Sequence, residues 1–232
     1  MKLPISKRLL ACADFVRQGA YAADVGADHG YLGIYLLQKG IAVHVTASDL
    51  REKPIERARQ NAERFGTADR MDFFCCDGLQ MADPLRTDTV ICAGMGSDCI
   101  IDILNAAPWI RRGDCRLVLQ PQSSGQDLRR YLAENGFELL RERLVEDGGF
   151  LYNVLEVCHT GMRTELTPGE QFVSPMLRES GDPLLPRYLS RLRESMKKTV
   201  AGLRSGGNDP EKLMYYETAL REIGAWEDDN SK

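Results

Sequence analysis

The chain has 232 residues, of which 43% are apolar and 28% charged, and its net charge is −4. This composition is typical of a folded globular protein, so it excludes a disordered chain and disfavours a basic protein that coats nucleic acid. The longest runs without a charged residue have 10 residues. A membrane span needs about 20 apolar residues, so we expect no span.

Short apolar runs predict five buried strands, and segments with helical patterns separate them. Strands that alternate with helices form a parallel sheet with helices on both faces. The predicted strands are Tyr21–Val25, Val43–Asp49, Met71–Cys75, Thr89–Ala93 and Arg116–Gln120.

The helices expected around these strands cover residues 6–16, His29–Lys39, Lys53–Phe65, Asp98–Ala106 and Ser124–Asn135. Two further predicted strands, Phe137–Val145 and Phe150–His159, flank Glu146-Asp147-Gly148-Gly149, and Asp-Gly is typical of a β-hairpin turn. Five parallel strands followed by an antiparallel hairpin are the order of a class I methyltransferase sheet. We therefore expect this Rossmann-like α/β fold.

The composition changes after Gly161, where prolines indicate a linker at Pro168, Pro175, Pro183 and Pro186. Two amphipathic helices are then predicted. The first should end at Ser205-Gly206-Gly207-Asn208, and the second should begin at Asp209-Pro210, an N-cap followed by proline. We expect a helical hairpin, a short antiparallel coiled coil, appended to the α/β part.

The segment Ala22–Leu32 (A-A-D-V-G-A-D-H-G-Y-L) contains the most informative turn. Its strand ends near Asp24, and Gly26 lets the backbone pass close to a ligand at the start of a helix. The glycine spacing is not that of a dinucleotide fingerprint. Carboxylates at Asp24 and Asp28 would repel a pyrophosphate and suit a cationic ligand such as S-adenosylmethionine. The alternative is an ordinary strand–turn–helix junction.

Polar groups also follow the next strands. Asp49 ends the second strand, where an acid typically binds ribose hydroxyls; the alternative is a helix N-cap. Asp77-Gly78 follows the third strand, where the acid can accept from an adenine amino group; the alternative is a simple Asp-Gly turn. The fourth strand ends in Ala93-Gly94-Met95-Gly96, at the sheet edge where ligands bind. Gln120-Pro121-Gln122 ends the fifth, either as part of the site or as a proline-terminated strand.

The chain has seven cysteines, which is an odd number, and no two of them have C-x-x-C spacing. This usage is typical of a reducing compartment, so we expect a cytoplasmic protein with cysteine as a small core residue. The three histidines are scattered along the chain, and we expect no metal site.

With these motifs, the chain resembles the bacterial tRNA (adenine(22)-N(1))-methyltransferases of the TrmK type. The resemblance runs nearly end to end, and the D-H-x-Y-L turn combined with A-G-M-G makes it specific. It is carried by Ser6-Lys7-Arg8-Leu9, Asp24–Leu32, Asp77-Gly78, Ala93-Gly94-Met95-Gly96, Leu119-Gln120-Pro121 and Glu146-Asp147-Gly148.

The resemblance implies methyl transfer from S-adenosylmethionine to N1 of an adenine in tRNA. It implies a methyltransferase domain over residues 1–162 and a helical coiled-coil domain over residues 163–232. The oligomeric state stays open between a monomer and a weak homodimer. Together with the motifs above, it gives the expected cofactor-binding residues, Arg8, Asp24, Gly26, Asp28, Asp49, Asp77, Gly78, Ala93, Gly94 and Met95.

Adenine N1 has a free lone pair, so alignment with the methyl donor should supply much of the rate enhancement. A carboxylate would stabilise the positive charge of the methylated base, and Asp28 is the residue that we assign to this role. The alternative is a cap of the following helix. His29, the second catalytic candidate, could stack on or bond to the base, or start the helix with no active role.

An acidic protein must meet a polyanion through local basic segments. Residues 187–204 carry six basic residues and one acid, whereas residues 209–232 carry seven acids and three basic residues. A basic helix there could grip phosphates, be merely solvated, or pair with the acidic helix that follows. The expected RNA-binding residues, the first two implied by the resemblance, are Lys7, Arg8, Arg187, Arg191, Arg193, Lys197 and Lys198.

Two other classes of function stay open at this point. One is a methyltransferase with the same cofactor domain that acts on a small molecule or a protein. The other is a non-catalytic module that binds RNA or a partner. The acids at Asp24, Asp49 and Asp77 argue against a non-catalytic module, because a module without a cofactor has no need of them.

Overall fold

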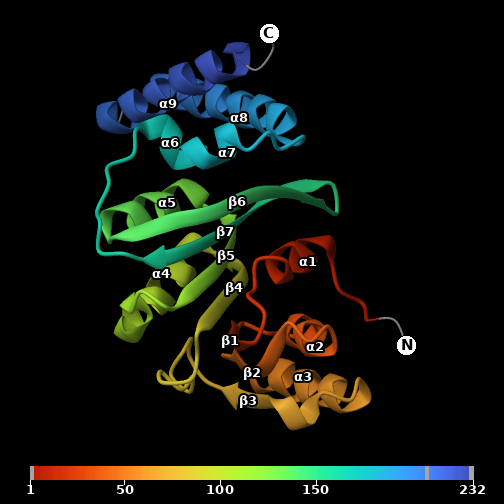
Figure 1. Ribbon diagram of the computed structural model, residues 1–232. Coiled ribbons are helices and arrows are strands. Elements are labelled where there is room, and N and C mark those ends of the chain that lie inside the picture. Colours follow the sequence, from red (N-terminus) through yellow and green to blue (C-terminus); the bar gives the residue numbers. More distant parts are fainter. Residues whose placement is uncertain (1–2, 207–208, 230–232) are drawn as a thin grey trace.

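A computed structural model describes residues 3–206 and 209–229. Its centre is a seven-stranded sheet with the order β3-β2-β1-β4-β5-β7-β6 (Figure 1). Strand β7 runs antiparallel to both of its neighbours, and the other neighbouring pairs are parallel. This confirms the predicted sheet. The strands are β1 (Ala20–Val25), β2 (Ala42–Asp49), β3 (Met71–Cys75), β4 (Thr89–Gly96), β5 (Arg116–Ser123), β6 (Phe137–Asp147) and β7 (Phe150–His159).

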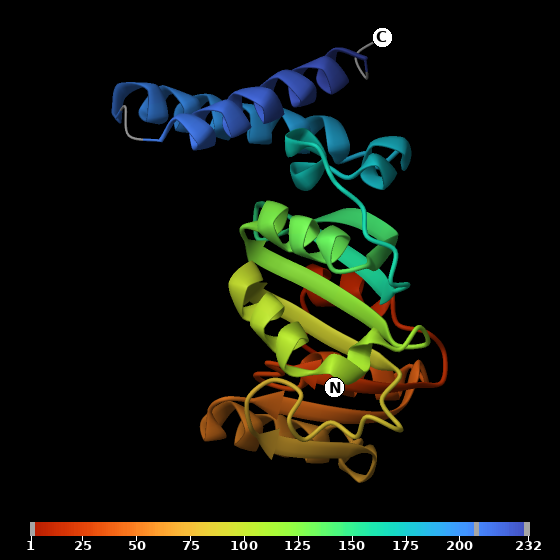
Figure 2. The same cartoon turned by 90° about the vertical axis from the view of Figure 1, so that its left-hand side faces the viewer.

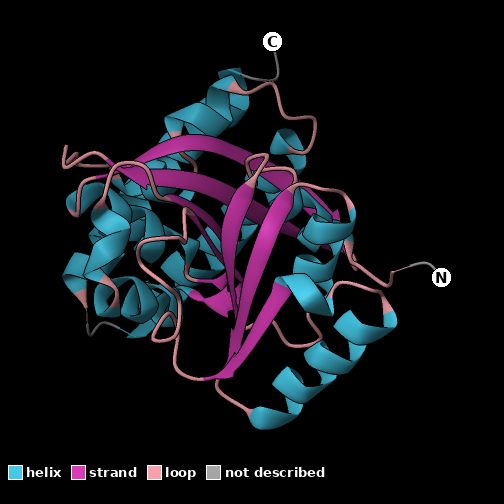
Figure 3. Cartoon of the chain, turned by 60° about the horizontal axis from the view of Figure 1, so that its bottom comes forward, coloured by secondary structure: helices cyan, strands magenta, loops and turns pink. Residues whose placement is uncertain are grey.

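Helices lie on both faces of this sheet (Figure 3). Ala11, Leu36 and Ala62, from the first three helices, share one buried cluster, whereas Ile100 and Leu128 belong to the cluster on the other face. The helices of this part are α1 (Lys7–Ala13), α2 (Tyr31–Gln38), α3 (Glu52–Arg64), α4 (Ser97–Ala106) and α5 (Gly125–Glu134), with 3-10 turns at Ala68–Arg70 and Pro108–Arg111.

The central strands are apolar on both sides because each side faces a helical layer. In β5, Val118 packs in the first cluster, and its neighbours Leu117 and Leu119 pack in the second. Successive side chains of a strand point to opposite faces, so a strand covered on both sides reads as an unbroken apolar run. The expected strands therefore match the observed ones within a few residues.

Helix α2 begins at Tyr31, later than the expected start at His29. The reason lies in the backbone of the preceding turn, where the N-cap residue Gly30 has a positive φ of +69°, so that the right-handed helix can begin only after it. His29 consequently lies in the loop. Helix α1 likewise ends at Ala13, short of the expected residue 16, and the Ser6 hydroxyl caps its start by accepting the Leu9 N–H.

The C-terminal part consists of α6 (Pro168–Phe172), α7 (Pro175–Glu179), α8 (Leu185–Gly206) and α9 (Pro210–Asp229). The last two form the expected helical hairpin, which lies beyond the β6 edge of the sheet (Figure 2). The predicted stop of the first helix falls partly on residues 207–208, outside the described residues. No helix in the described part of the chain is long and apolar enough to cross a membrane.

The expected linker is wrong for Pro168 and Pro175, which each begin a short helix. Proline is favoured there because the first turn of a helix does not use its N–H groups. The Thr167 hydroxyl caps α6 in a reciprocal capping box with Glu170. The sequence Thr167-Pro168-Gly169-Glu170 carries this signal, although its helix is too short to show a period.

A buried polar cluster joins this C-terminal part to the sheet. Arg129 of α5 pairs with Glu142 of β6, and their side chains are 4% and 0% exposed. Asn153 and the Ser174 hydroxyl also donate to the Glu142 carboxylate. Because a buried charge is stable only when its partners are in place, these contacts fix α7 against the sheet.

Candidate active site

A cavity of about 440 Å³ lies at the carboxyl ends of β1, β2 and β4 and the loop after β3. Parallel strands bring their carboxyl ends to one edge, which is where ligands bind in such folds. Eight of the ten predicted cofactor residues line this cavity; they are Gly26, Asp28, Asp49, Asp77, Gly78, Ala93, Gly94 and Met95.

Some residues of the cavity were missed in the sequence. Leu50 lines it with 67% of its surface exposed, which adds an apolar side chain to a border of acids and glycines. Cys76 and Cys99 line it as well, and burial raises the pKa of both thiols. Leu50 directly follows Asp49 in the sequence, and this position after a predicted site residue could have indicated that Leu50 lines the cavity.

The turn after β1 and the carboxyl end of β4 meet in this cavity. Gly26 has a φ of +67°, and a Cβ atom there would lie 2.2 Å from the Cε of Met95. Gly94 also has a positive φ, and a Cβ on it would lie 3.1 Å from an Arg8 nitrogen. The absence of a side chain at Gly26 thus leaves room for Met95, and at Gly94 it leaves room for Arg8.

Asp28 and His29 do not cap helix α2. The N-cap position is Gly30, which has no side chain to cap the helix, and the carboxyl that bonds the first turn, at the Gly33 N–H, is that of Asp24. Asp28 lines the cavity with its side chain 59% exposed, and His29 Nε2 lies 3.6 Å from its Oδ2. The His29 ring stacks on Tyr31 and does not line the cavity. This geometry excludes the cap alternative for Asp28.

Asp49 ends β2 with its side chain 10% exposed, and its Oδ1 accepts the backbone N–H of Arg51 at 3.0 Å. The N-cap of α3 is Arg51, which has no capping side-chain bond, so the N-cap alternative for Asp49 is wrong. The turn at Asp77 is fixed by a hydrogen bond that the Ser48 hydroxyl donates to the Gly78 carbonyl at 2.9 Å. Hydrogen bonds therefore fix the backbone next to both Asp49 and Asp77, which line the cavity.

Asp24 lies apart from the cavity, buried under the turn with 3% exposure. Burial raises the pKa of its carboxyl to about 7, and a hydrogen bond from the Gly33 backbone opposes the shift. Its Oδ2 has no hydrogen-bond partner among the described residues. Its assignment as a cofactor ligand stays a prediction, and its visible role is to bond the first turn of α2.

Arg8 is the other predicted cofactor residue that does not line the cavity. Its guanidinium donates a hydrogen bond to the Gln120 side chain and lies 5.8 Å from the ring centroid of Tyr152. With its nearness to Gly94, these contacts place Arg8 at the β4–β5 end of the cavity. Helix α1 thus contacts β5 at this end of the cavity, although Arg8 and Gln120 are more than a hundred residues apart in the sequence.

The two basic segments come together at the β6–β7 turn. Arg187 pairs with Glu146 at 2.8 Å, and this contact lowers the pKa of Glu146, with smaller effects from Arg191 and Lys7. Arg191 also donates to the carbonyl of Gly149 at 3.3 Å. Lys7, Arg187 and Arg191, here called the basic cluster, therefore surround one turn.

The rest of helix α8 is different. Arg193 pairs with Glu227 of α9 at 2.8 Å, as expected from the alternative in which the two helices pair by charge. Lys197 pairs with Glu194 of its own helix, and Lys198 is exposed. In the first half of the predicted RNA-binding helix, Arg187 and Arg191 contact the β6–β7 turn.

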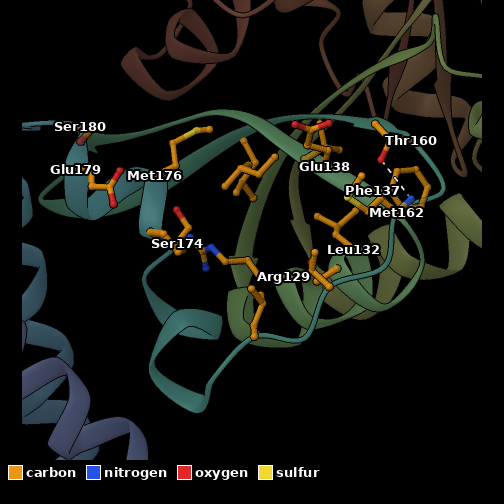
Figure 4. A pocket seen from close by; sticks show the side chains of 17 residues that line it. Arg129, Leu132, Phe137, Glu138, Thr160, Met162, Ser174, Met176, Glu179 and Ser180 are labelled. Carbon is orange, nitrogen blue, oxygen red and sulfur yellow. Dashed lines mark hydrogen bonds between the residues drawn. The ribbon is translucent and has the colours of Figure 1, made fainter.

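A second cavity of about 690 Å³ lies between α5, the β6–β7 hairpin and the segment that leads to α7 (Figure 4). Leu132, Phe137 and Met176 give it a largely apolar lining. No described residue at the carboxyl end of β1, β2, β3, β4 or β5 lines this second cavity. It is a space between the sheet and the C-terminal segment, and none of the predicted site residues line it.

Known proteins resemble the chain in sequence and in structure. Residues 5–155 match a family model of the methyltransferase domain. The tRNA (adenine(22)-N(1))-methyltransferase of Bacillus subtilis is 31% identical over 176 residues, which are 76% of this chain and 74% of that protein.

Two solved structures share almost the whole architecture. A Streptococcus agalactiae protein of the NADB-Rossmann superfamily has a TM-score of 0.85 and 29% identity, covering 97% of this chain and 98% of its own. A Streptococcus pneumoniae protein in complex with S-adenosyl-L-methionine has a TM-score of 0.79 and 28% identity, covering 93% of this chain and 99% of its own.

Proposed function

Because the chain belongs to the bacterial tRNA (adenine(22)-N(1))-methyltransferase family, we propose that it transfers the methyl group of S-adenosylmethionine to N1 of adenine 22 in tRNA. The observation that carries this proposal is the cavity in which Asp28, Asp49 and Asp77 meet two glycine turns. A related protein binds S-adenosyl-L-methionine with the same fold.

The residues of the cavity fit this cofactor. Its volume of about 440 Å³ lies within the range of small-molecule sites, about 300–1,000 Å³. Asp49 would hold the ribose hydroxyls and Asp77 the adenine amino group, with Leu50 against a face of the ring. Three carboxylates suit a ligand with a net positive charge. When bound, the cofactor supplies a methyl group on a positively charged sulfur, which a nitrogen lone pair can attack.

Asp28 is the group that this chain offers for the chemical step. The N1 lone pair needs no base to free it, but the adenine becomes positive as the methyl group arrives. A fixed carboxylate stabilises such a charge as it develops. The turn holds Asp28 in a left-handed backbone conformation, a type of local strain that often occurs at functional sites. The Nε2 atom of His29 lies 3.6 Å from the Oδ2 atom of this carboxylate.

The basic cluster would position the tRNA. Lys7 is the chain neighbour of Arg8, which lies at the β4–β5 end of the cavity, and Arg187 and Arg191 flank the same turn. Contacts of these side chains with phosphates would supply a salt-dependent affinity. Because the rest of the surface is net acidic, such local contacts also orient the tRNA.

All groups used above come from one chain, so a monomer or weak homodimer suffices. We place the boundary between the methyltransferase domain and the C-terminal domain at residues 162 and 163, between β7 and α6. The substrate and the unpaired cysteines would both place the enzyme in the cytoplasm.

The test is methyl transfer from labelled S-adenosylmethionine to two tRNA transcripts that differ only in adenine or guanine at position 22. We expect label in the first transcript and background in the second. Equal labelling of both would contradict the position, and binding of the cofactor without label in either would indicate another acceptor.

A further inference from the structure

A groove of about 530 Å³ separates the methyltransferase sheet from helix α8, and the proposed function does not use it. One wall consists of residues 121–126 and the first residues of β7. The other wall is the face of α8 that carries Tyr188, Ser195 and Thr199.

The groove begins where the cofactor cavity ends. Gln122 lines the groove, and its Nε2 lies 3.5 Å from the position of a Cβ on Gly94, which lines the cavity. Pro121 pairs with Met95 across β4 and β5. A chain that leaves the β4–β5 end of the cavity would therefore enter this groove.

Two aromatic side chains form part of the groove. Phe150 and Tyr152 share one face of β7, with ring centroids 6.4 Å apart. Phe150 is 66% exposed, and Arg8 lies over the Tyr152 ring. Exposed rings in a polar groove are typical of sites that stack nucleobases, because every base has a flat face.

The groove lacks the negative charge of the cavity. No aspartate or glutamate is among the described residues that line it, and the charge of Arg129, which lines it, is paired with buried Glu142. Arg191 of the basic cluster lies beside its β7 end, on the carbonyl of Gly149. Hydroxyls of Ser124, Ser195 and Thr199 add neutral donors. This lining suits a phosphodiester chain with its bases.

Adenine N1 is the atom that pairs with uracil in a duplex, so the target adenine must leave its pair before it can be methylated. Extrusion of a base also loosens the stacking of its neighbours, which costs free energy unless the protein replaces it. We propose that this groove binds an unpaired nucleotide next to the methylated adenine, with its base on Phe150 and Tyr152. This rests on the proposed function and extends its substrate site.

The test compares Phe150→Ala, Phe150→Trp and Ser195→Trp with the wild-type enzyme, using an unmodified tRNA transcript. Leu85→Ala is the control, since Leu85 is 91% exposed on the loop before β4 and away from the groove. We expect Phe150→Ala to raise KM for tRNA about tenfold, the size of one lost stacking contact. Phe150→Trp keeps an aromatic ring and should leave the KM for tRNA at the wild-type value. Ser195→Trp should raise this KM, because the larger side chain fills the groove. Calorimetric affinity for S-adenosylmethionine should not change in any of them.

Wild-type KM values in both Phe150→Ala and Ser195→Trp would overturn the proposal, provided that the wild-type enzyme methylates the transcript. A wild-type enzyme that makes no methylated tRNA would contradict the proposed function instead. Photo-crosslinking with p-benzoylphenylalanine in place of Phe150 gives a second readout. A crosslink to a nucleotide adjoining the methylated adenine supports the groove, and a crosslink confined to a distant arm of the tRNA contradicts it.

Discussion

The ε-methyl group of Met95 occupies the space beside Gly26, so that a Cβ on this glycine would lie 2.2 Å from it. The contact joins the turn after β1 to the carboxyl end of β4, two segments that are nearly seventy residues apart. Both segments border the candidate cofactor cavity. The shape of the cavity therefore depends on this one close approach.

Gly26→Ala should weaken cofactor binding strongly, because the new Cβ must displace Met95 into the cavity. Gly40→Ala is the matched control, since Gly40 has a similar φ of +65° and open space around its Cβ position. Both variants should lose about 1 kcal/mol or more of unfolding free energy from backbone strain. Only Gly26→Ala should lose affinity in calorimetry, and equal affinities in the two variants would contradict this account.

Asp28→Asn should lower kcat about a hundredfold, because it removes the charge that stabilises the methylated base. Asp69→Asn, an exposed acid before β3 at the opposite edge of the sheet, serves as the control and should keep full activity. The measurement is single-turnover methyl transfer with both substrates saturating. Near-normal turnover of Asp28→Asn would remove this carboxylate from the mechanism.

Asp24 should make the stability of the cofactor-free protein depend on pH. Burial raises the pKa of Asp24 from 3.8 to about 7, so between these values the folded state holds a proton that the unfolded state has lost. The unfolding free energy should therefore fall as pH rises from about 4 to 7, by about 1.4 kcal/mol for each pKa unit of the shift.

The corresponding variant is Asp24→Asn, which keeps an oxygen for the Gly33 N–H and cannot ionise. Relative to the wild-type protein it should gain stability between pH 5 and pH 8, as measured by urea unfolding without cofactor. A constant difference between the two proteins over this range would show that Asp24 does not titrate there.

Replacing Arg187 and Arg191 together by glutamine should weaken tRNA binding and make it less sensitive to salt. Each lost phosphate contact lowers the slope of log affinity against log salt by about 0.7–0.9. Arg204→Gln is the control, because Arg204 lies near the end of α8 and pairs with Glu217 of α9. An unchanged slope in the double variant would mean that this part of α8 is only solvated.

The sequence predicted the sheet well because its strands are covered on both sides and end in polar or glycine-rich turns. Asp49, Asp77 and Gly94 could be assigned from their places at strand ends alone, since parallel topology brings such ends to one edge. Those positions are local features, which a sequence read in order displays directly.

Contacts between segments that are distant in the sequence could not be predicted from local sequence patterns. Nothing in the pattern around Arg8 indicates that it bonds to Gln120, and the burial of Asp24 follows from the packing of α2 over its strand. The start of α2 also shifted, because Gly30 at its N-cap has a positive φ, a backbone conformation that the helical pattern does not indicate. Tertiary packing decides these features.

Nucleoside mass spectrometry of a tRNA transcript after incubation with the enzyme and S-adenosylmethionine tests the central claim most directly. The account predicts 1-methyladenosine, mapped to position 22 by nuclease fragments, and its loss in Asp28→Asn. Methylation of the exocyclic amino group, of another base, or of a protein or small molecule in place of tRNA would contradict it.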